Sequence, residues 1–297
     1  HLFDFAMRAY LLVCLALTLL TQPVHAAVNE VLPGDYFPLS PGDTSVALYA
    51  FDRNLAGPYA GGQKLLDGNV DSQTLALRLV HFFRIGDTTV STVFVLPWAR
   101  SDVTPAPLAA RLGAEAQGFG DLRIGMTAWP INDRENANYL GMTAMLIAPT
   151  GAYDDARVIN PGENRWRFVL GGGWQKDITP QWLVELSPEI AYYGDNDDYL
   201  GNRRLAQRTT YAVTGYLRYR LNTVWHLFLG GQINRGGETQ LNGVAQDNPA
   251  NIERLMAGVT LFLPDRHQLI LRAATDTAID NGFRLEREIS VRYQKSF

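Results

Sequence analysis

Pairs of charged residues that lie two or four positions apart are the main chemical feature of the sequence. Examples are Arg165 with Arg167, and Glu185 with Glu189. If these segments are β-strands, side chains at this spacing share one face. Guanidinium and carboxylate groups on such a face can bind or guide ions and polar solutes, or they can pair with each other. The spacing therefore predicts charged ladders along one face of a sheet.

No arrangement typical of a hydrolase accompanies these ladders. Ser187 lies between Glu185 and Glu189, but a serine nucleophile needs an activating base such as histidine, and none is near it in the sequence. The sequence contains neither a G-x-S-x-G motif nor two histidines at metal-binding spacing. We therefore expect no enzymatic activity, no catalytic residues and no cofactor.

An acidic segment, 194–199, is the weak candidate for a metal site because it carries Asp195, Asp197 and Asp198. Carboxylate oxygens are ligands for Ca²⁺, but the twelve-residue loop with its final Glu is missing. A solvated or hydrogen-bonded acidic loop is favoured, so no metal is expected.

Alternation of apolar and polar residues identifies the elements that carry the charged ladders. In segment 182–193, Trp182, Val184 and Leu186 share one face, and Glu185 and Ser187 share the other. Such segments are about 10–14 residues long, which is closer to tilted membrane strands of about 9–11 residues than to soluble strands of about 5–6. The predicted strands are 44–53, 72–85, 88–98, 119–129, 138–149, 165–176, 182–193, 208–220, 223–235, 252–263, 267–275 and 284–297.

Composition limits the classes of protein to which these strands can belong. The 297 residues carry a net charge of −4, with 46% hydrophobic and 19% charged residues, and the mean hydropathy is −0.10. A nucleic-acid-binding protein would show a basic excess, which is missing here. Two classes remain: a soluble all-β protein, and a β-barrel whose apolar face contacts lipid.

Connection lengths favour the membrane barrel. Short connections at 86–87, 130–137, 177–181, 221–222 and 264–266 alternate with long ones at 54–71, 99–118, 150–164, 194–207 and 236–251, while the final one, 276–283, is moderate. Bacterial outer-membrane barrels have an even number of strands, short periplasmic turns and longer outer loops. We therefore predict an all-β fold, a transmembrane antiparallel up-and-down β-barrel of about 12 strands over residues 44–297.

The tryptophans provide a second indication. All six lie near the ends of predicted strands, where aromatic side chains form girdles at the two membrane interfaces. The predicted interface residues are Trp98, Trp129, Trp166, Trp174, Trp182 and Trp225.

In such a barrel the polar faces line the lumen, because a charged side chain in lipid costs roughly 2–4 kcal/mol at mid-depth. These side chains either line a selective pore or pair across a narrow lumen and plug it. Twelve strands lie between the eight that leave no aqueous channel and the sixteen to eighteen that do, and this size favours a constricted lumen. The candidate lumen residues are Arg78, Arg123, Arg165, Arg167, Glu185, Glu189, Arg218, Arg220, Arg254, Arg272, Glu286, Glu288 and Arg292.

The N-terminal part is expected to lie outside the barrel wall. After six upstream residues, Met7 begins a pattern typical of a secretory signal peptide, with Arg8, an apolar stretch and small residues ending at Ala26. We expect residues 1–26 to be removed. Residues 27–43 contain three prolines and are unsuited to a strand; they form either a periplasmic tail or a plug in the barrel mouth.

Several motifs together resemble one known family. They are LSPGDT at 39–44, LVHFF at 79–83, WPIND at 129–133, PTG at 149–151, GENRW at 162–166, YGDNDDY at 193–199 and NGF at 281–283. The sequence resembles the outer-membrane barrel family named for the meta-cleavage pathway of phenol degradation, whose members are called transporters. This resemblance implies an outer-membrane barrel and a role in the uptake of small, often aromatic, molecules. It implies no catalytic residues.

The last strand also resembles the signal that the barrel-assembly machinery reads. Phe297 is the final residue and Tyr293 shares its face, although Lys295 departs from the usual apolar choice.

We expect a channel in the outer membrane of a Gram-negative cell that passes small hydrophobic or aromatic solutes passively. The expected partners are outer-membrane lipid, lipopolysaccharide, the barrel-assembly machinery and the solute, with no nucleic acid. The alternative is a structural or surface-interaction barrel that has a constricted lumen and transports nothing.

Overall fold

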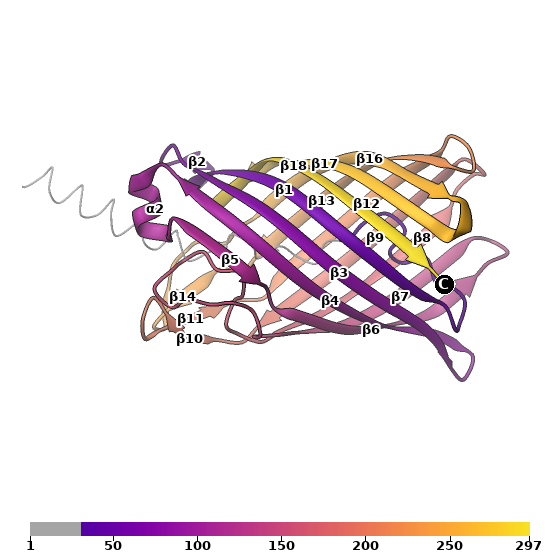
Figure 1. Cartoon of the computed structure of the whole chain (residues 1–297), viewed down its shortest axis with the longest axis horizontal. Coiled ribbons are helices and arrows are strands. Elements are labelled where there is room, and N and C mark those ends of the chain that lie inside the picture. Colours follow the sequence, from indigo (N-terminus) through magenta and orange to yellow (C-terminus); the bar gives the residue numbers. More distant parts are fainter. Residues whose placement is uncertain (1–30) are drawn as a thin grey trace, which may run out of the picture.

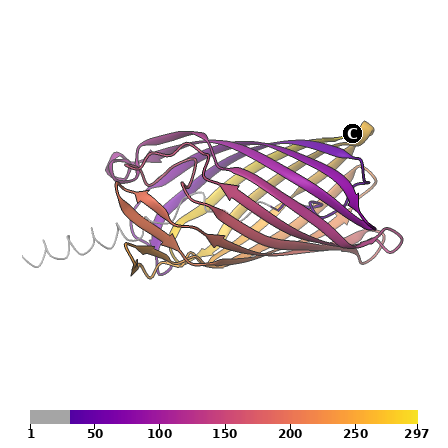
Figure 2. The same ribbon diagram turned by 90° about the horizontal axis from the view of Figure 1, so that it is seen from below.

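The structure, a computed structural model, describes residues 31–297, so the predicted signal peptide lies outside the described residues. Within this range, twelve long strands form a closed antiparallel β-barrel, which confirms the predicted fold (Figures 1 and 2). The long strands are β1 (Thr44–Ala60), β3 (Asn69–Ile85), β4 (Thr88–Thr104), β6 (Leu122–Asp133), β7 (Asn138–Ala148), β8 (Arg167–Asp177), β9 (Trp182–Tyr193), β12 (Thr210–Arg220), β13 (Trp225–Gly236), β16 (Ile252–Leu263), β17 (His267–Ile279) and β18 (Gly282–Ser296).

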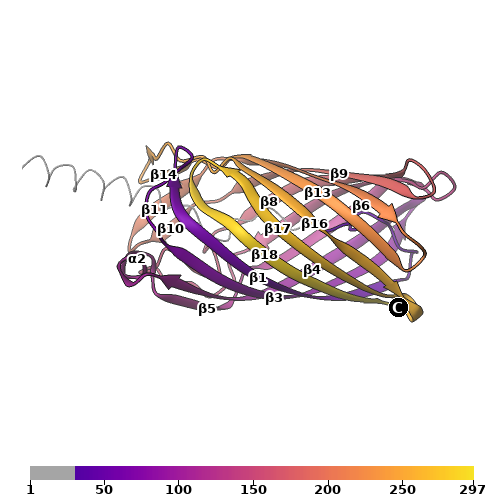
Figure 3. The ribbon, with the colours of Figure 1, turned by 90° about the horizontal axis from the view of Figure 1, so that it is seen from above.

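The first and last strands close the barrel. β1 pairs with β3 on one side and with β18 on the other, and this second pairing begins where Ser45 lies opposite Ser296. Figure 3 shows β1 and β18 side by side along the barrel. Every other long strand pairs with the long strands before and after it in the chain. The topology is therefore up-and-down and the barrel is closed, with β17 and β18 paired from His267 opposite Lys295 to Ala274 opposite Glu288.

The two ends of the barrel differ in the length of their connections. Short turns and the 3-10 helix η1 (Pro264–Arg266) lie at the end where the C-terminus is found (Figure 1). The opposite end, which we call the outer end, carries α2 (Ala106–Leu112) and the short strands β2 (Gln63–Lys64), β5 (Glu115–Phe119), β10 (Asn196–Tyr199), β11 (Arg203–Gln207), β14 (Thr239–Leu241) and β15 (Val244–Ala245).

Several strands extend further toward the outer end than their alternation predicted. β1, β3 and β4 have 17 residues each, so that most of the predicted loop 54–71 is strand. The pairing of β1 with β18 shifts register between Asn54 and Leu55 and again between Ala56 and Tyr59. Such irregularities interrupt the period-two pattern. This explains why the alternation of β1 ended before the strand did, whereas β3 and β4 pair with each other in regular register as far as Asn69 opposite Thr104.

Side-chain parity separates the two surfaces of the wall. Along β3 the leucines Leu75, Leu77 and Leu79 are exposed on the outside, whereas Val80 and Phe82 are buried inside. Large exposed apolar residues recur in the same way on the other long strands. In the described part of the chain, no helix has the length and apolar character needed to cross a membrane.

Candidate functional site

Part of the N-terminal segment lies inside the barrel and contacts strands from different parts of the wall. The hydroxyl of Tyr216 on β12 donates to the carbonyl oxygen of Val31 at 2.8 Å. The Trp129 indole on β6 donates to the Tyr36 carbonyl oxygen at 3.0 Å. The backbone N–H of Gly34 donates to Glu185 Oε2 at 2.8 Å. We call residues 31–39 the lumen segment, because these contacts hold it across the interior.

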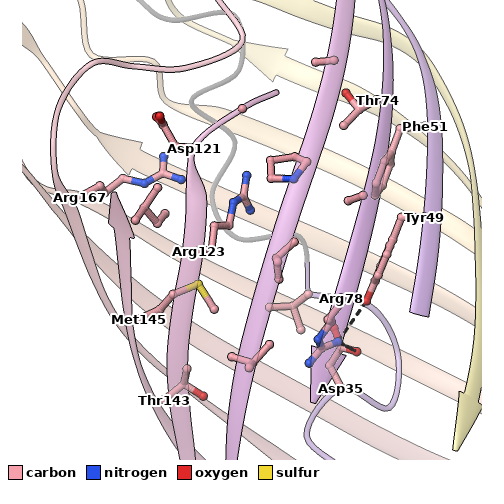
Figure 4. A pocket seen from close by; sticks show the side chains of 18 of the residues that line it. Asp35, Tyr49, Phe51, Thr74, Arg78, Asp121, Arg123, Thr143, Met145 and Arg167 are labelled. Atoms are coloured by element: carbon pink, nitrogen blue, oxygen red, sulfur yellow. Dashed lines mark hydrogen bonds and ion pairs between the residues drawn. The ribbon is translucent and has the colours of Figure 1, made fainter. Parts of the chain in front are cut away.

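Asp35 is the centre of the ion pairs that hold the lumen segment. Its Oδ1 accepts a hydrogen bond from Arg78 Nη1 at 2.9 Å (Figure 4) and another from Nη1 of Arg292. Its Oδ2 accepts the backbone N–H of Leu32 at 2.9 Å, which closes the turn. The Asp35 side chain is only 10% exposed. Breaking a buried ion pair leaves an uncompensated charge, at a cost of about 3–5 kcal/mol.

Two cavities lie on either side of Asp35. The outer cavity, of about 170 Å³, reaches Pro161 and Glu163 at the outer end. The inner cavity, of about 410 Å³, reaches Arg266 and His267 at the end with short turns. Asp35 and Arg78 line both cavities. The lumen segment and its ion pair therefore form the partition between them.

The outer cavity combines an apolar wall with charged side chains. Val95, Met145 and Ile147 belong to its lining, and so do Tyr49 and Phe51, whose rings are stacked with centroids 6.0 Å apart. Arg78, Arg123 and Arg167 also line it (Figure 4). Mostly apolar concave sites with a few placed charged groups are typical of sites for small ligands.

A second polar cluster lies at the outer end of the outer cavity and forms part of its lining. Glu163 Oε2 accepts from Arg165 Nη2 at 2.8 Å, and Glu163 Oε1 accepts from Arg167 Nη1 at 3.1 Å. Burial alone would raise the pKa of Glu163, but the guanidinium groups of Arg167 and Arg165 hold it below the usual value. Asp121 accepts the backbone N–H groups of Gly151 and Glu163 at 2.9 and 2.7 Å. Burial raises the pKa of Asp121 despite these bonds.

Most predicted lumen residues face inward, and many form ion pairs with side chains of neighbouring strands. Arg218 Nη1 lies 2.7 Å from Glu185 Oε1, and Arg254 Nε lies 2.7 Å from Asp276 Oδ1. The fully buried Glu288 accepts from Arg53 Nε at 2.7 Å and from Arg272 Nε at 3.1 Å. The predicted residues on the inward face are Arg78, Arg123, Arg165, Arg167, Glu185, Glu189, Arg218, Arg220, Arg254, Arg272, Glu288 and Arg292.

The prediction for Glu286 is wrong, because its side chain does not line the lumen. The register of β1 with β18 passes from Asn54 opposite Arg287 to Leu55 opposite Leu285, so Glu286 is an extra residue in a β-bulge. Its side chain is 44% exposed. The bulge places Glu286 and Arg287 consecutively on the exposed side, where strict alternation would have turned Glu286 inward.

The prediction for Trp129 is also wrong. Its side chain is buried inside the barrel at 4% exposure, where its ring lies 5.5 Å from that of Phe82. An indole on this inward face finds its hydrogen-bond acceptor in the lumen segment instead of at a membrane interface. The other five tryptophans, Trp98, Trp166, Trp174, Trp182 and Trp225, have outward parity on their strands or next to them.

The remaining candidates lie at the two ends of the barrel. Asp195 Oδ2 accepts from Arg204 Nε at 2.7 Å, and the same guanidinium lies 3.7 Å from Asp197. Among residues 31–297, no group of three or more His, Cys, Asp or Glu side chains could hold a metal. Tyr293 and Phe297 are exposed on the last strand and at the C-terminus.

Sequence reasoning missed the residues that organise the interior. Asp35, Tyr36, Asp121 and Glu163 lie outside the long strands, where no periodicity marks a face. Asp276 faces inward in regular alternation with Arg272 and Ala274, but it lies one residue beyond the predicted strand 267–275, and a register shift against β16 follows it. Glu163 belongs to the motif GENRW, but no spacing in the sequence indicated that these residues meet inside the barrel.

Comparisons with known proteins agree with this architecture. Residues 54–293 match the family model described as "Putative MetA-pathway of phenol degradation". The chain is similar to the solved structure of an outer-membrane channel from Pseudomonas putida F1, with 31% identity and a TM-score of 0.85; the match covers 90% of this chain and 100% of that chain. The β domain of the Bordetella autotransporter Brka has 13% identity and a TM-score of 0.53, covering 86% of this chain and 100% of that chain, and it is similar in fold alone. No curated protein matches the sequence.

Proposed function

The chain belongs to this MetA-pathway family of outer-membrane β-barrels, and from that premise we propose that it is a channel for small hydrophobic or aromatic solutes. Passage is passive and involves no chemical step. The solute enters the outer cavity, passes the lumen segment and leaves through the inner cavity to the periplasm. The similarity to the P. putida channel supports the channel role.

The observation that carries the proposal is the partition between the two cavities. Two cavities lie inside the wall, and Asp35 with Arg78 lines both of them. Movement of the lumen segment would join these spaces without any change in the strand pairing of the barrel. The apolar part of the outer cavity suits the body of a small hydrophobic solute.

A flux measurement tests the proposal. Purified protein is reconstituted into liposomes, and influx of phenol and catechol is compared with influx into protein-free liposomes of the same lipid. Faster influx with the protein is expected. If no member of a panel of small aromatics and anions crosses faster than through lipid alone, the channel proposal fails.

A variant of Asp35 connects the flux to the lumen segment. Asp35→Asn removes the carboxylate that Arg78 and Arg292 share, and leaving these buried arginines without it costs about 3–5 kcal/mol. We expect the segment to leave its closed position more often, so solute influx increases. Asp52→Asn is the matched control, since Asp52 pairs with Arg287 at 2.9 Å on the exposed side of the barrel.

A further inference from the structure

A row of inward residues crosses five neighbouring strands of the wall. Arg78 on β3 lies opposite Val95 on β4, which lies opposite Arg123 on β6. Arg123 in turn lies opposite Ile147 on β7, and Ile147 lies opposite Arg167 on β8. We call these five residues the arginine row. Neighbouring strands are about 4.8 Å apart, so successive arginines are separated by roughly 10 Å with an apolar residue between them.

The arginine row forms part of the wall of the outer cavity. All five of its residues line that cavity. Arg167 is bonded to Glu163 in the loop that precedes β8, and Arg78 is bonded to Asp35 in the lumen segment. Figure 4 shows Arg78, Arg123 and Arg167 projecting from their separate strands into the cavity. The row therefore connects the outer loops with the partition.

Alternating guanidinium groups and apolar side chains are complementary to a molecule that has one carboxylate and an apolar body. A guanidinium binds a carboxylate through charge-assisted, often bidentate, hydrogen bonds. Valine and isoleucine between the arginines offer apolar contacts to the body of such a molecule. The stacked rings of Tyr49 and Phe51 add an aromatic surface to the same cavity.

The size and charge of the outer cavity narrow the choice of ligand. Its volume is about 170 Å³, and a protein cavity of about 150 Å³ accommodates benzene. Its lining includes four arginines and three carboxylates, so positive charge exceeds negative charge by one. A single aromatic ring with one negative charge suits both properties.

Two carboxylates of the protein already occupy the ends of the row. Glu163 Oε1 lies 3.1 Å from Arg167 Nη1, and Asp35 Oδ1 lies 2.9 Å from Arg78 Nη1. The row thus already binds carboxylates in this chain. A solute carboxylate that reaches Arg78 competes with Asp35 for the same guanidinium, and Asp35 is the residue that holds the lumen segment.

From these observations we propose that the outer cavity is a binding site for small aromatic carboxylates, which displace Asp35 from Arg78 as they pass inward. The inference rests on the proposed channel function and deepens it, because it names the solute class. A neutral aromatic fills the cavity without competing for the arginines, so it binds more weakly and leaves the lumen segment in place.

Calorimetry with the full chain in detergent tests the site. Benzoate is the probe, benzyl alcohol has the same ring without the charge, and acetate has the carboxylate without the ring. We expect benzoate to bind more tightly than either comparator, by about tenfold or more, since a charge-assisted hydrogen bond is lost with the alcohol. Equal affinities for benzoate and benzyl alcohol would overturn the proposal.

Substitution at the middle of the row locates the site. Arg123→Gln is expected to weaken benzoate binding by about 10- to 100-fold and to leave benzyl alcohol unaffected. Arg254→Gln is the matched control, because Arg254 is an inward arginine that pairs with Asp276 and does not line the outer cavity. Wild-type affinity for benzoate in Arg123→Gln would place the site elsewhere and overturn the proposal. If this variant fails to fold, the comparison of benzoate with benzyl alcohol decides alone.

The binding and flux measurements together distinguish a failure of the carboxylate site from a failure of the channel function. If phenol crosses liposomes through the protein but benzoate does not bind, the carboxylate site is wrong and the channel stands. If benzoate binds as expected but no solute crosses, the site stands and the channel is wrong.

Discussion

Tyr36 shows how single residues fit the lumen segment to the wall. Its ring packs against Gly173 on β8 so closely that a Cβ atom at Gly173 would overlap the ring, and a Cβ atom at Gly141 would lie 2.8 Å from Tyr36 Cδ1. The ring can lie there only because neither residue has a side chain. The lumen segment is therefore held by shape at Tyr36 and by charge at Asp35.

Gly173→Ala is expected to open the lumen. Keeping Tyr36 in place against the new methyl group would cost roughly 1–3 kcal/mol of overpacking, so the segment shifts and single-channel conductance in planar bilayers increases. Gly231→Ala is the control, because a Cβ atom there meets only the Arg254 carbonyl oxygen at 3.7 Å. Equal conductances for the two variants would show that Tyr36 does not help to close the lumen.

The ionisation of Glu163 makes the stability of the loop at residues 149–166 depend on pH. Its pKa lies below the usual 4.5 because Arg167 and Arg165 outweigh the effect of burial. A carboxyl with a lowered pKa in the folded state stabilises that state above its unfolded pKa, and the contribution is lost as pH falls through the folded pKa.

We therefore expect backbone amides of residues 149–166 to exchange faster at acidic pH, below about 4.5, than at neutral pH after correction for intrinsic rates. Hydrogen exchange by mass spectrometry measures this. Glu163→Gln is the control, because its loop has no carboxyl to titrate at this position. The interpretation would be contradicted if the amide protection of this loop in the wild type stayed constant as the pH falls below the pKa of Glu163.

At the scale of the strand, the β-bulge at Glu286 decides which side chains of β18 face the lumen. Before the bulge Leu285 is buried, after it Glu288 is buried, and the two residues between them are exposed. A strand without a bulge cannot turn two consecutive side chains to the same face. The bulge therefore keeps both Leu285 and Glu288 inside the barrel.

Deleting Glu286 should be tolerated, since the shortened strand would alternate regularly with Leu285 and Glu288 still inward. Deleting Ser290 should prevent assembly, because Ser290 lies in regular register with Phe51 and Arg272. Removing it inverts the faces on one side of the deletion. Recovery of folded protein from outer membranes compares the two, and equal recovery would contradict this account.

At the scale of the molecule, the barrel is stabilised by closed strand pairing around a filled interior. The pairing of β1 with β18 joins residues more than two hundred positions apart, from Ser45 with Ser296 to Tyr59 with Gly282. Ion pairs such as Arg53 with Glu288 add side-chain contacts across the same junction, with Arg53 Nε 2.7 Å from Glu288 Oε2. Closure leaves few backbone groups on the long strands that detergent could compete for.

Heat-modifiable migration is therefore expected in detergent gels. Unheated protein should migrate as a compact barrel, and boiled protein should migrate at the position of the unfolded chain. Deletion of β18 is the comparison, because it leaves β1 without its closing partner and should abolish the difference. Identical migration of the intact chain before and after boiling would contradict a stable closed barrel.

The sequence by itself determined the wall of this protein. Period-two alternation in segments such as 182–193 follows from a strand that has lipid on one side and a lumen on the other, and each segment carries that pattern locally. The long strands, their order and most inward charges could therefore be predicted. Glu286 was misplaced because a bulge breaks the period. Trp129 was misplaced because it was assigned to a membrane interface from its position at a strand end, although it shares the parity of the inward Arg123 on the same strand.

Only the tertiary structure decided what lies inside the wall. The lumen segment has no periodicity, and its position depends on contacts between Asp35 and two arginines that are 43 and 257 residues away along the chain. The arginine row likewise depends on register across five strands, which no single segment encodes. Alternation within one strand predicts which face a side chain is on. The residues that this side chain contacts depend on how all the strands pair when the barrel closes.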